Sequence, residues 1–217
     1  DKIYKWLIEN DNYYNFCISH KDYETYKRDG ANVDKLLVCP NGAQHRDYHF
    51  TEKPLKPSWT LYLGRIEPRK RQYLYQDIYG VEFVGKYTDT TSFDRNRDCY
   101  LGQWEHEYKL QHVTDYGNMM LLSDGENGTP LVIKEALVAG LGVVVSKYAA
   151  HDLDTSLPFV TVIPDDKWED IEYVQMKLIE NRKISVTMRK EIRQYGVDNF
   201  SWQKLVKTYV ENIEGME

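Results

Sequence analysis

Short runs of apolar residues recur from residue 59 onward and alternate with helical or irregular segments. The longer runs lie at residues 59–66, 81–85, 118–123, 142–146 and 159–163, with a shorter one at 99–102. Strands that are apolar throughout have no solvent-facing side, which is typical of a parallel sheet covered by helices on both faces. We therefore predict an α/β chain, a Rossmann-like doubly wound parallel sheet with a helical C-terminal tail.

Further elements are predicted on both sides of this sheet. The predicted helices cover residues 2–10, 20–30, 104–116, 130–139, 168–181, 184–195 and 202–213, and two more strands cover residues 15–19 and 35–40. The stretch 44–58, with two prolines, is predicted as an irregular loop or linker. The last helix carries one apolar stripe, which we expect to pack on residues 1–30: Leu205, Val206, Tyr209, Val210 and Ile213.

Composition excludes some classes of function. The net charge of −6 gives no general attraction to nucleic acid or anionic lipid. The 3 cysteines form no C-x-x-C pair, which suits reduced thiols and a cytoplasmic location, either free or peripheral at a membrane. No apolar run approaches the roughly 20 residues of a membrane helix. The sequence opens on Asp1 rather than Met, so we expect a piece of a longer protein.

The segment 118–140 predicts a strand, a polar loop and a helix that begins at the edge of the sheet. Thr129 is a predicted N-cap, Pro130 suits the first helical position, and Gly140 ends the helix. Open α/β sheets bind ligands at this edge. Free N–H groups and the helix dipole favour an anion there, commonly a phosphate.

Glu135 lies on this helix among apolar neighbours at three- and four-residue spacing. A buried carboxylate is costly unless a polar group is held against it. Side chains lean toward the helix N-terminus, so Glu135 could accept hydrogen bonds from hydroxyls beside a bound anion, as in a ribose. The alternative, which spacing alone leaves open, is an internal ion pair with Lys or Arg.

Several stretches resemble the retaining GT-B glycosyltransferases of family four, which includes bacterial mannosyl- and glucosyltransferases. Residues 123–146, "SDGENGTPLVIKEALVAGLGVVVS", resemble the region of the second glutamate of that family. The other matches follow in family order: "LLVCPNGA", "LYLGRIEPRKR", "VEFVGK", "CYLGQW" and "NFSWQKLV". Together they cover about residues 16–217 and imply the C-terminal half of a GT-B glycosyltransferase.

The resemblance implies a role for each matching residue. Arg65 and Lys70 would neutralise the diphosphate of a nucleotide-sugar donor, and Glu135 would bind its ribose. The loop that cradles the diphosphate would comprise Gly128, Thr129, Pro130 and Leu131. Gly64 precedes Arg65 at the end of its strand. Two further strand ends would flank the base: Gly85 with Lys86, and Leu101 with Gln103.

Two positions depart from the family pattern. Asn127 occupies the place of the first glutamate, and Glu126 comes one residue early. Either the loop bulges so that Glu126 still reaches the sugar as a catalytic group, or an amide replaces the carboxylate. Arg71 replaces the glycine that usually follows the lysine.

Other sites find little support. His45 and His49 have ligand-like spacing but lie in a loop, so no metal site is expected. The acidic segment 88–98 lacks the calcium-loop pattern and is predicted as a flexible loop. No P-loop and no dinucleotide-binding G-x-G-x-x-G occurs.

We interpret residues 1–43 as a remnant of an N-terminal, acceptor-side domain with its linker, and residues 44–217 as the donor-binding domain. The predicted activity is metal-independent transfer of a hexose from a UDP- or GDP-sugar to a hydroxyl of a glycan, protein or lipid. The nucleotide-sugar is a substrate, and no other cofactor is expected. The alternatives are a non-catalytic nucleotide-sugar-binding or scaffolding module that needs a separate acceptor domain, and an RNA-binding basic loop, which the acidic total disfavours.

Overall fold

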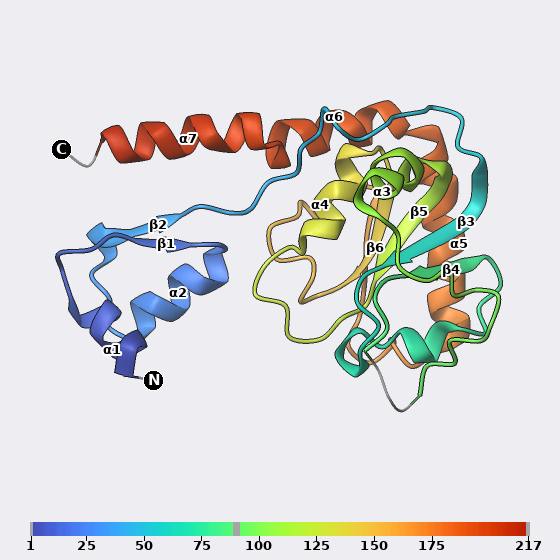
Figure 1. Ribbon diagram of the computed structural model, residues 1–217, viewed down its shortest axis with the longest axis horizontal. Helices are drawn as coiled ribbons and strands as arrows, with labels where there is room; N and C mark the ends of the chain where they lie inside the picture. The colour runs from blue at the N-terminus through green and yellow to red at the C-terminus, as the bar shows by residue number, and fades with distance from the viewer. Residues whose placement is uncertain (1, 89–91, 216–217) are drawn as a thin grey trace.

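A computed structural model describes residues 2–88 and 92–215. Its largest sheet has 5 parallel strands in the order β4-β3-β5-β6-β7 (Figure 1). The strands are β3 (Lys56–Leu63), β4 (Val81–Val84), β5 (Tyr116–Leu121), β6 (Gly142–Ser146) and β7 (Val160–Ile163). The predicted Rossmann-like α/β fold is confirmed. The predicted strand at 99–102 forms a bridge between Tyr100 and Phe83 of β4 instead.

Helices cover both faces of this sheet. Those of the larger part are α3 (His106–His112), α4 (Leu131–Val138), α5 (Ile171–Thr187) and α6 (Arg189–Phe200). Figure 1 shows α4 and α5 on opposite sides of β5 and β6, and both helices contact these strands. The predicted helix 168–181 is α5, which begins and ends later. Asp170 caps it by accepting a hydrogen bond from the Tyr173 amide at 3.0 Å.

A buried amide network fixes α5 against the centre of the sheet. Asn118 Nδ2 donates to Asn181 Oδ1 at 3.0 Å, and Asn181 Nδ2 donates to the Phe159 carbonyl at 3.0 Å. Thr60 Oγ1 donates to Asn118 Oδ1 at 2.6 Å. Because a buried amide without partners is costly, this network specifies one register between β3, β5 and α5.

Residues 2–38 form a smaller body with its own apolar cluster. It contains α1 (Lys2–Glu9), β1 (Asn15–Cys17), α2 (His20–Arg28) and β2 (Leu36–Val38), and β1 and β2 pair in parallel. Its buried apolar residues are Ile8, Cys17, Ala31 and Leu36. These elements were predicted, and Gly30, just after α2, has a positive φ of +97°. The division of the chain at residue 43 stays a prediction.

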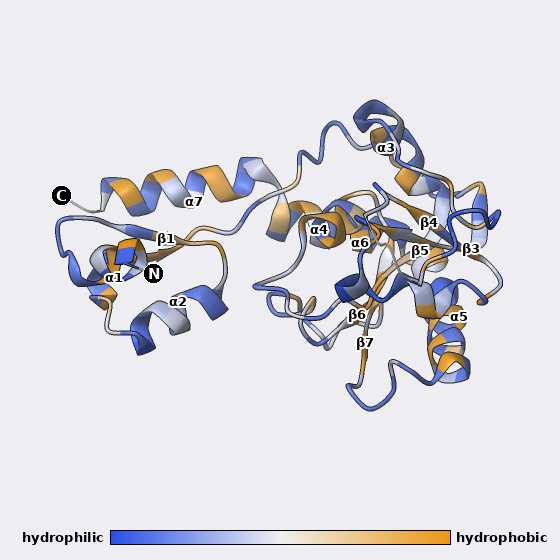
Figure 2. Cartoon of the chain, turned by 60° about the horizontal axis from the view of Figure 1, so that its bottom comes forward, coloured by the Kyte–Doolittle hydropathy of each residue, from blue (hydrophilic) through white to orange (hydrophobic). Residues whose placement is uncertain are grey.

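The last helix, α7 (Trp202–Glu214), extends away from the large sheet and lies above the small body (Figure 1). Its predicted burial on residues 1–30 is wrong for three residues of the stripe. Val206, Val210 and Ile213 are 46–50% exposed, and Figure 2 shows apolar residues along the length of this helix. This helix contacts α6 and the segment that follows β2, where the Tyr209 hydroxyl donates to the Pro40 carbonyl.

Two further predictions concern a loop and membrane-spanning helices. Residues 89–91, in the segment predicted as a flexible loop, lie outside the described residues. Within the described ranges, no helix combines the length and apolar composition that crossing a membrane requires.

Gly196 allows α6 to pack closely against α4, the helix that follows the polar loop. A Cβ at this position would lie 2.5 Å from the Leu137 carbonyl carbon and 2.6 Å from the Val138 amide nitrogen. These are backbone atoms, which cannot rotate away.

We predict that Gly196→Ala destabilises the protein, although alanine is favoured over glycine by about 1 kcal/mol in a helix interior. The clash with α4 outweighs that preference and lowers the free energy of unfolding by about 1–3 kcal/mol. Denaturant unfolding measures the change, and Asn199→Ala on the exposed side of α6 is the matched control. Equal or higher stability of Gly196→Ala would contradict this account of the α4–α6 contact.

Candidate functional site

Two loops meet at the carboxyl edge of the sheet because β3 and β5 are adjacent and parallel. The loop after β3 covers residues 64–71, and the loop after β5 covers residues 122–130. Tyr62, at the end of β3, connects them: its hydroxyl donates to the Lys70 carbonyl and accepts from the Leu122 amide at 3.1 Å. The Asp124 amide also donates to the Arg69 carbonyl at 3.0 Å. Backbone contacts therefore fix the two loops to each other.

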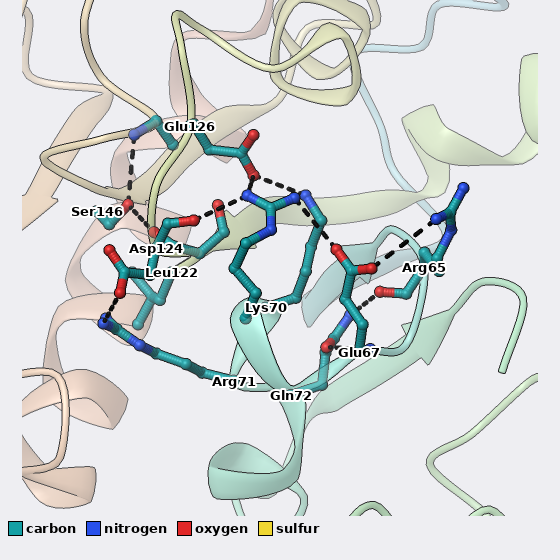
Figure 3. A network of polar contacts seen from close by, with 12 residues as sticks. Arg65, Glu67, Lys70, Arg71, Gln72, Leu122, Asp124, Glu126 and Ser146 are labelled. Atoms are coloured by element: carbon teal, nitrogen blue, oxygen red, sulfur yellow. Dashed lines mark hydrogen bonds and ion pairs between the residues drawn. The ribbon is translucent and has the colours of Figure 1, made fainter. Parts of the chain in front are cut away.

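Figure 3 shows the Glu126 carboxylate in contact with two cationic side chains. Its Oε1 lies 2.7 Å from Lys70 Nζ and 2.9 Å from Arg69 Nη1. Burial opposes ionisation of Glu126, but the hydrogen bond from Lys70 and the charges of Lys70 and Arg69 hold its pKa below the ordinary value. Glu126 therefore occupies the cationic site as a carboxylate.

The small body restrains the same loop from the other side. Lys21 Nζ, on α2, donates to the Glu126 carbonyl at 3.0 Å. This contact joins residues far apart in the sequence and fixes the backbone that carries the carboxylate.

Arg65 lies at the margin of this arrangement. Its side chain is 65% exposed, and Nη1 lies 4.0 Å from Glu67 Oε2. Glu67 also binds Arg69 Nη2 at 3.1 Å. The structure thus brings Lys70 and Glu126 together and leaves Arg65 exposed beside them (Figure 3).

A cavity of about 330 Å³ opens between the loop 122–130 and the small body, near the lower end of the size range of small-molecule sites. It is lined by Ile18, Asn41, Arg69, Gly125, Glu126, Asn127, Gly128, Thr129, Pro130, Leu131 and Lys134. The predicted loop residues 126–131 therefore share one cavity. Both candidates for the first glutamate position, Glu126 and Asn127, line it, and Glu126 is the one held by Lys70.

Gly128 and Thr129 are held from behind by Asp152. The Thr129 amide donates to Asp152 Oδ2 at 3.3 Å, and the Asp152 amide donates to Thr129 Oγ1 at 3.1 Å. A Cβ on Gly128 would lie 2.7 Å from Ser19 Cβ, so only glycine permits this approach. The Thr129 N–H, predicted to be free for an anion, is bound to a carboxylate of the protein itself.

The predicted start of the helix is wrong by one residue. Pro130 is the N-cap of α4 and makes no side-chain cap hydrogen bond, whereas Thr129 was the predicted cap. The Thr129 hydroxyl is instead used by Asp152. Leu131 and Val132 then stand at the first helical positions, where amide groups have no intrahelical acceptor.

Glu135 does not lie in the cavity. Its Oε1 binds Lys109 Nζ of α3 at 2.7 Å, and the residue is 6% exposed. Burial and the charge of Glu135 raise the pKa of Tyr48 beside it. The contact with Lys109 is the internal ion pair with a lysine that the sequence left open, and the ribose contact of Glu135 stays a prediction.

The residues predicted to flank the base lie at the β4 end of the edge, outside this cavity. Lys86, Leu101 and Gln103 are exposed. Position 85 requires a glycine because a Cβ there would lie 1.9 Å from the Gly64 carbonyl oxygen. Gly64 in turn lies under the Lys70 side chain, whose Cδ would be 3.6 Å from an added Cβ.

Arg71 stands where the family pattern has a glycine, and its backbone conformation is one that glycine favours. It adopts a left-handed conformation, φ +57° and ψ 17°, which glycine adopts without steric cost. Its guanidinium lies 3.9 Å from the centre of the Trp168 ring and 3.5 Å from Asp124 Oδ2. These contacts offset the roughly 1–2 kcal/mol of strain.

Sequence reasoning missed several groups of this cavity. Arg69 was visible only as part of a basic run, and Ile18 and Asn41 reach the cavity through tertiary packing. Lys134 precedes Glu135 and was not predicted to line the site, because an isolated lysine on a helix is normally solvated. Across the described part of the chain, no 3 His, Cys, Asp or Glu side chains come together as a metal site.

No protein-family model matches this sequence, and no curated protein matches it. Solved structures do resemble its fold. HepE from Anabaena, in complex with UDP-glucose, aligns with a TM-score of 0.69 at 15% identity over 92% of this chain and 63% of that one. Sucrose-phosphate synthase from Thermosynechococcus elongatus aligns with a TM-score of 0.75 at 17% identity over 99% of this chain and 61% of that one.

A third solved structure, the lipopolysaccharide outer core galactosyltransferase WaaB, aligns with a TM-score of 0.69 at 18% identity over 94% of this chain and 62% of that one. The chain thus spans about three-fifths of the length of the structures it matches. At these identities the likeness concerns the fold alone. It confirms the predicted Rossmann-like α/β fold.

We predict that Glu126 makes stability depend on pH. Its folded-state pKa is depressed, so its contribution is complete above the unfolded pKa of about 4.3 and is lost as pH falls through the folded value. At neutral pH, Glu126→Gln should lower the free energy of unfolding by about 2 kcal/mol, and the difference from wild type should shrink in acid.

Thermal unfolding between neutral pH and about pH 3 measures this difference. Glu107→Gln, at an exposed position of α3, is the matched control. A gap between wild type and Glu126→Gln that stays constant across the acid range would show that the ion pair does not stabilise the fold.

Proposed function

We propose that this chain is the donor-binding half of a retaining, metal-independent GT-B glycosyltransferase. It binds a UDP- or GDP-sugar and passes the hexose to an acceptor hydroxyl. The observation that carries this proposal is the cluster of Lys70, Arg69 and Glu126, which adjoins a cavity at the start of α4. Its place at the carboxyl edge of a parallel sheet is where this class of fold binds nucleotides.

Lys70, Arg69 and Arg65 serve the leaving group in this proposal. As the bond between the anomeric carbon and the phosphate oxygen breaks, negative charge grows on the nucleoside diphosphate. Charge-assisted hydrogen bonds to that oxygen stabilise the transition state. Each is worth roughly 1.5–3 kcal/mol, which corresponds to about ten- to a hundredfold in rate.

In the ligand-free site, the Glu126 carboxylate occupies the position proposed for the diphosphate of the donor, next to Lys70 and Arg69. A diphosphate that binds Lys70 and Arg69 must displace the carboxylate from them. The released Glu126, or Asn127 beside it, is then available to hydroxyls of the sugar. HepE, a structure of similar fold, is in complex with UDP-glucose, which supports a uridine nucleotide as one donor class to test.

The acceptor site requires more chain than these residues provide. Ile18 and Asn41 already contribute one wall of the cavity from the side of the small body. A further domain on that side would bind the glycan, protein or lipid acceptor. The proposal includes a cytoplasmic site of action, which a lipid acceptor would bring to a membrane surface.

A second candidate is a non-catalytic nucleotide-sugar-binding or scaffolding module. Two observations favour it: Glu126 neutralises Lys70 and Arg69, and Glu135 is bound to Lys109. In that case the site would bind a nucleotide-sugar, and the fold would serve a partner that carries the chemistry.

We predict that the protein binds UDP or GDP and their hexose derivatives, and that the cations carry the affinity. Lys70→Met should weaken binding about ten- to a hundredfold, and the exposed Arg65→Ala about tenfold. Isothermal titration calorimetry measures both. Lys207→Met, whose side chain is 76% exposed on α7, is the matched control. Failure of every nucleotide to bind, or full affinity in folded Lys70→Met, would refute the proposed donor site.

Slow hydrolysis of the bound donor distinguishes a catalytic site from a non-catalytic nucleotide-sugar-binding module. If the site activates its donor, the protein should release free hexose from a UDP- or GDP-hexose. Lys70→Met should lower this rate about ten- to a hundredfold at saturating donor. Tight binding of a donor that stays intact over days would favour the non-catalytic module.

A further inference from the structure

Lys134 is a buried cation in the first turn of α4. The residue is 2% exposed, and its Nζ donates to the Asn41 carbonyl at 3.0 Å. Among the described residues, no carboxylate lies within ion-pair distance of this ammonium group. A lysine is rarely buried without a charged partner, because the ammonium group loses its hydration.

The position of Lys134 on the helix is a second reason why its charged form is unfavourable. Side chains in a helix lean toward its N-terminus, where the dipole of α4 is positive. A cation held there is repelled by the helix as well as desolvated. Burial lowers the pKa of Lys134, and the charge of Asp152 opposes this effect only in part.

Asp152 is already engaged. Its Oδ2 accepts from the Thr129 amide at 3.3 Å, and its Oδ1 lies 3.5 Å from His20 Nδ1. Asp152 therefore acts on Lys134 through its charge, and the structure shows no ion pair between the two side chains. Methionine has a similar length and would fill this space with no charge to desolvate, so packing alone does not explain a lysine.

The same residue lines the cavity of the candidate site. Lys134, Arg69 and Leu131 all contribute to its wall, and so does Asn41, which holds the ammonium group. A group with several negatively charged oxygens in this cavity would relieve both the desolvation and the repulsion by the helix. Phosphate is such a group, and helix starts commonly bind it.

We propose that Lys134 binds the phosphate oxygens of the nucleotide-sugar donor, as a contact additional to Lys70, Arg69 and Arg65. This inference rests on the proposed function for the identity of the ligand. In the ligand-free protein, the Asn41 carbonyl holds the ammonium group in place. On binding, a phosphate oxygen becomes its charged partner.

The test uses Lys134→Gln, which removes the charge but keeps an N–H donor for the Asn41 carbonyl. Calorimetric titration compares wild type and variant with UDP, with inorganic pyrophosphate and with uridine, which has no phosphate. We expect the variant to bind UDP and pyrophosphate at least about tenfold more weakly. Its affinity for uridine and its ligand-free unfolding temperature should equal or exceed those of wild type.

Proton uptake gives a second measurement. An anion beside Lys134 raises its pKa, so UDP binding to wild type at pH 9 should take up protons, and binding to Lys134→Gln should take up fewer. Comparing binding enthalpies in two buffers of different ionisation enthalpy detects this. Lys134→Met, which also lacks the hydrogen bond, should behave as Lys134→Gln does if the charge is what matters.

The outcomes separate the two proposals. Equal binding of UDP and pyrophosphate by wild type and Lys134→Gln would overturn the role of Lys134 and leave the proposed function standing. Charge-dependent binding of pyrophosphate without any preference for UDP or GDP would support the phosphate contact and refute the nucleotide-sugar donor. Loss of uridine binding together with a lower unfolding temperature would show a structural role and overturn the inference.

Discussion

The ion pair of Glu126 with Lys70 and Arg69 is the interaction on which the site depends. It joins the loop after β3 to the loop after β5, and these loops meet only because their strands are parallel neighbours. The same contact places a carboxylate on the cations proposed to hold a diphosphate. In the ligand-free site, the charges of Lys70 and Arg69 are thus paired with the Glu126 carboxylate, and any anionic ligand must compete with Glu126.

Internal carboxylates recur around this cavity. Asp152 binds the Thr129 amide, as Glu126 binds Lys70. Lys134 instead contacts the Asn41 carbonyl and the Phe200 ring, and no carboxylate among the described residues lies within ion-pair distance of it. The anion-binding groups therefore differ in how readily they can accept a ligand. Lys134 has no carboxylate to lose, whereas Lys70 and Thr129 must exchange one. This difference makes the buried lysine the group that gains most from a phosphate.

Much of this architecture could be predicted from the sequence. The apolar strands predicted a parallel sheet, and the strand–loop–helix pattern located the edge where residues 126–131 line a cavity. Contacts between distant segments could not be predicted. The ion-pair partner of Glu135 could not be named from the sequence because Lys109 lies on α3, whose position depends on tertiary packing. The same holds for Asp152 and for Asn41 beside Lys134. Local patterns predict elements and edges, whereas the partner of a buried charge is decided by the packed structure.

The most direct test of the central claim is a crystal structure of the protein with UDP bound. The account predicts that the diphosphate lies in the cavity beside Gly128 and Thr129, within hydrogen-bond distance of Lys70 Nζ, and that the Glu126 carboxylate has moved away from Lys70. A diphosphate bound elsewhere, with the contact between Glu126 and Lys70 unchanged, would contradict it.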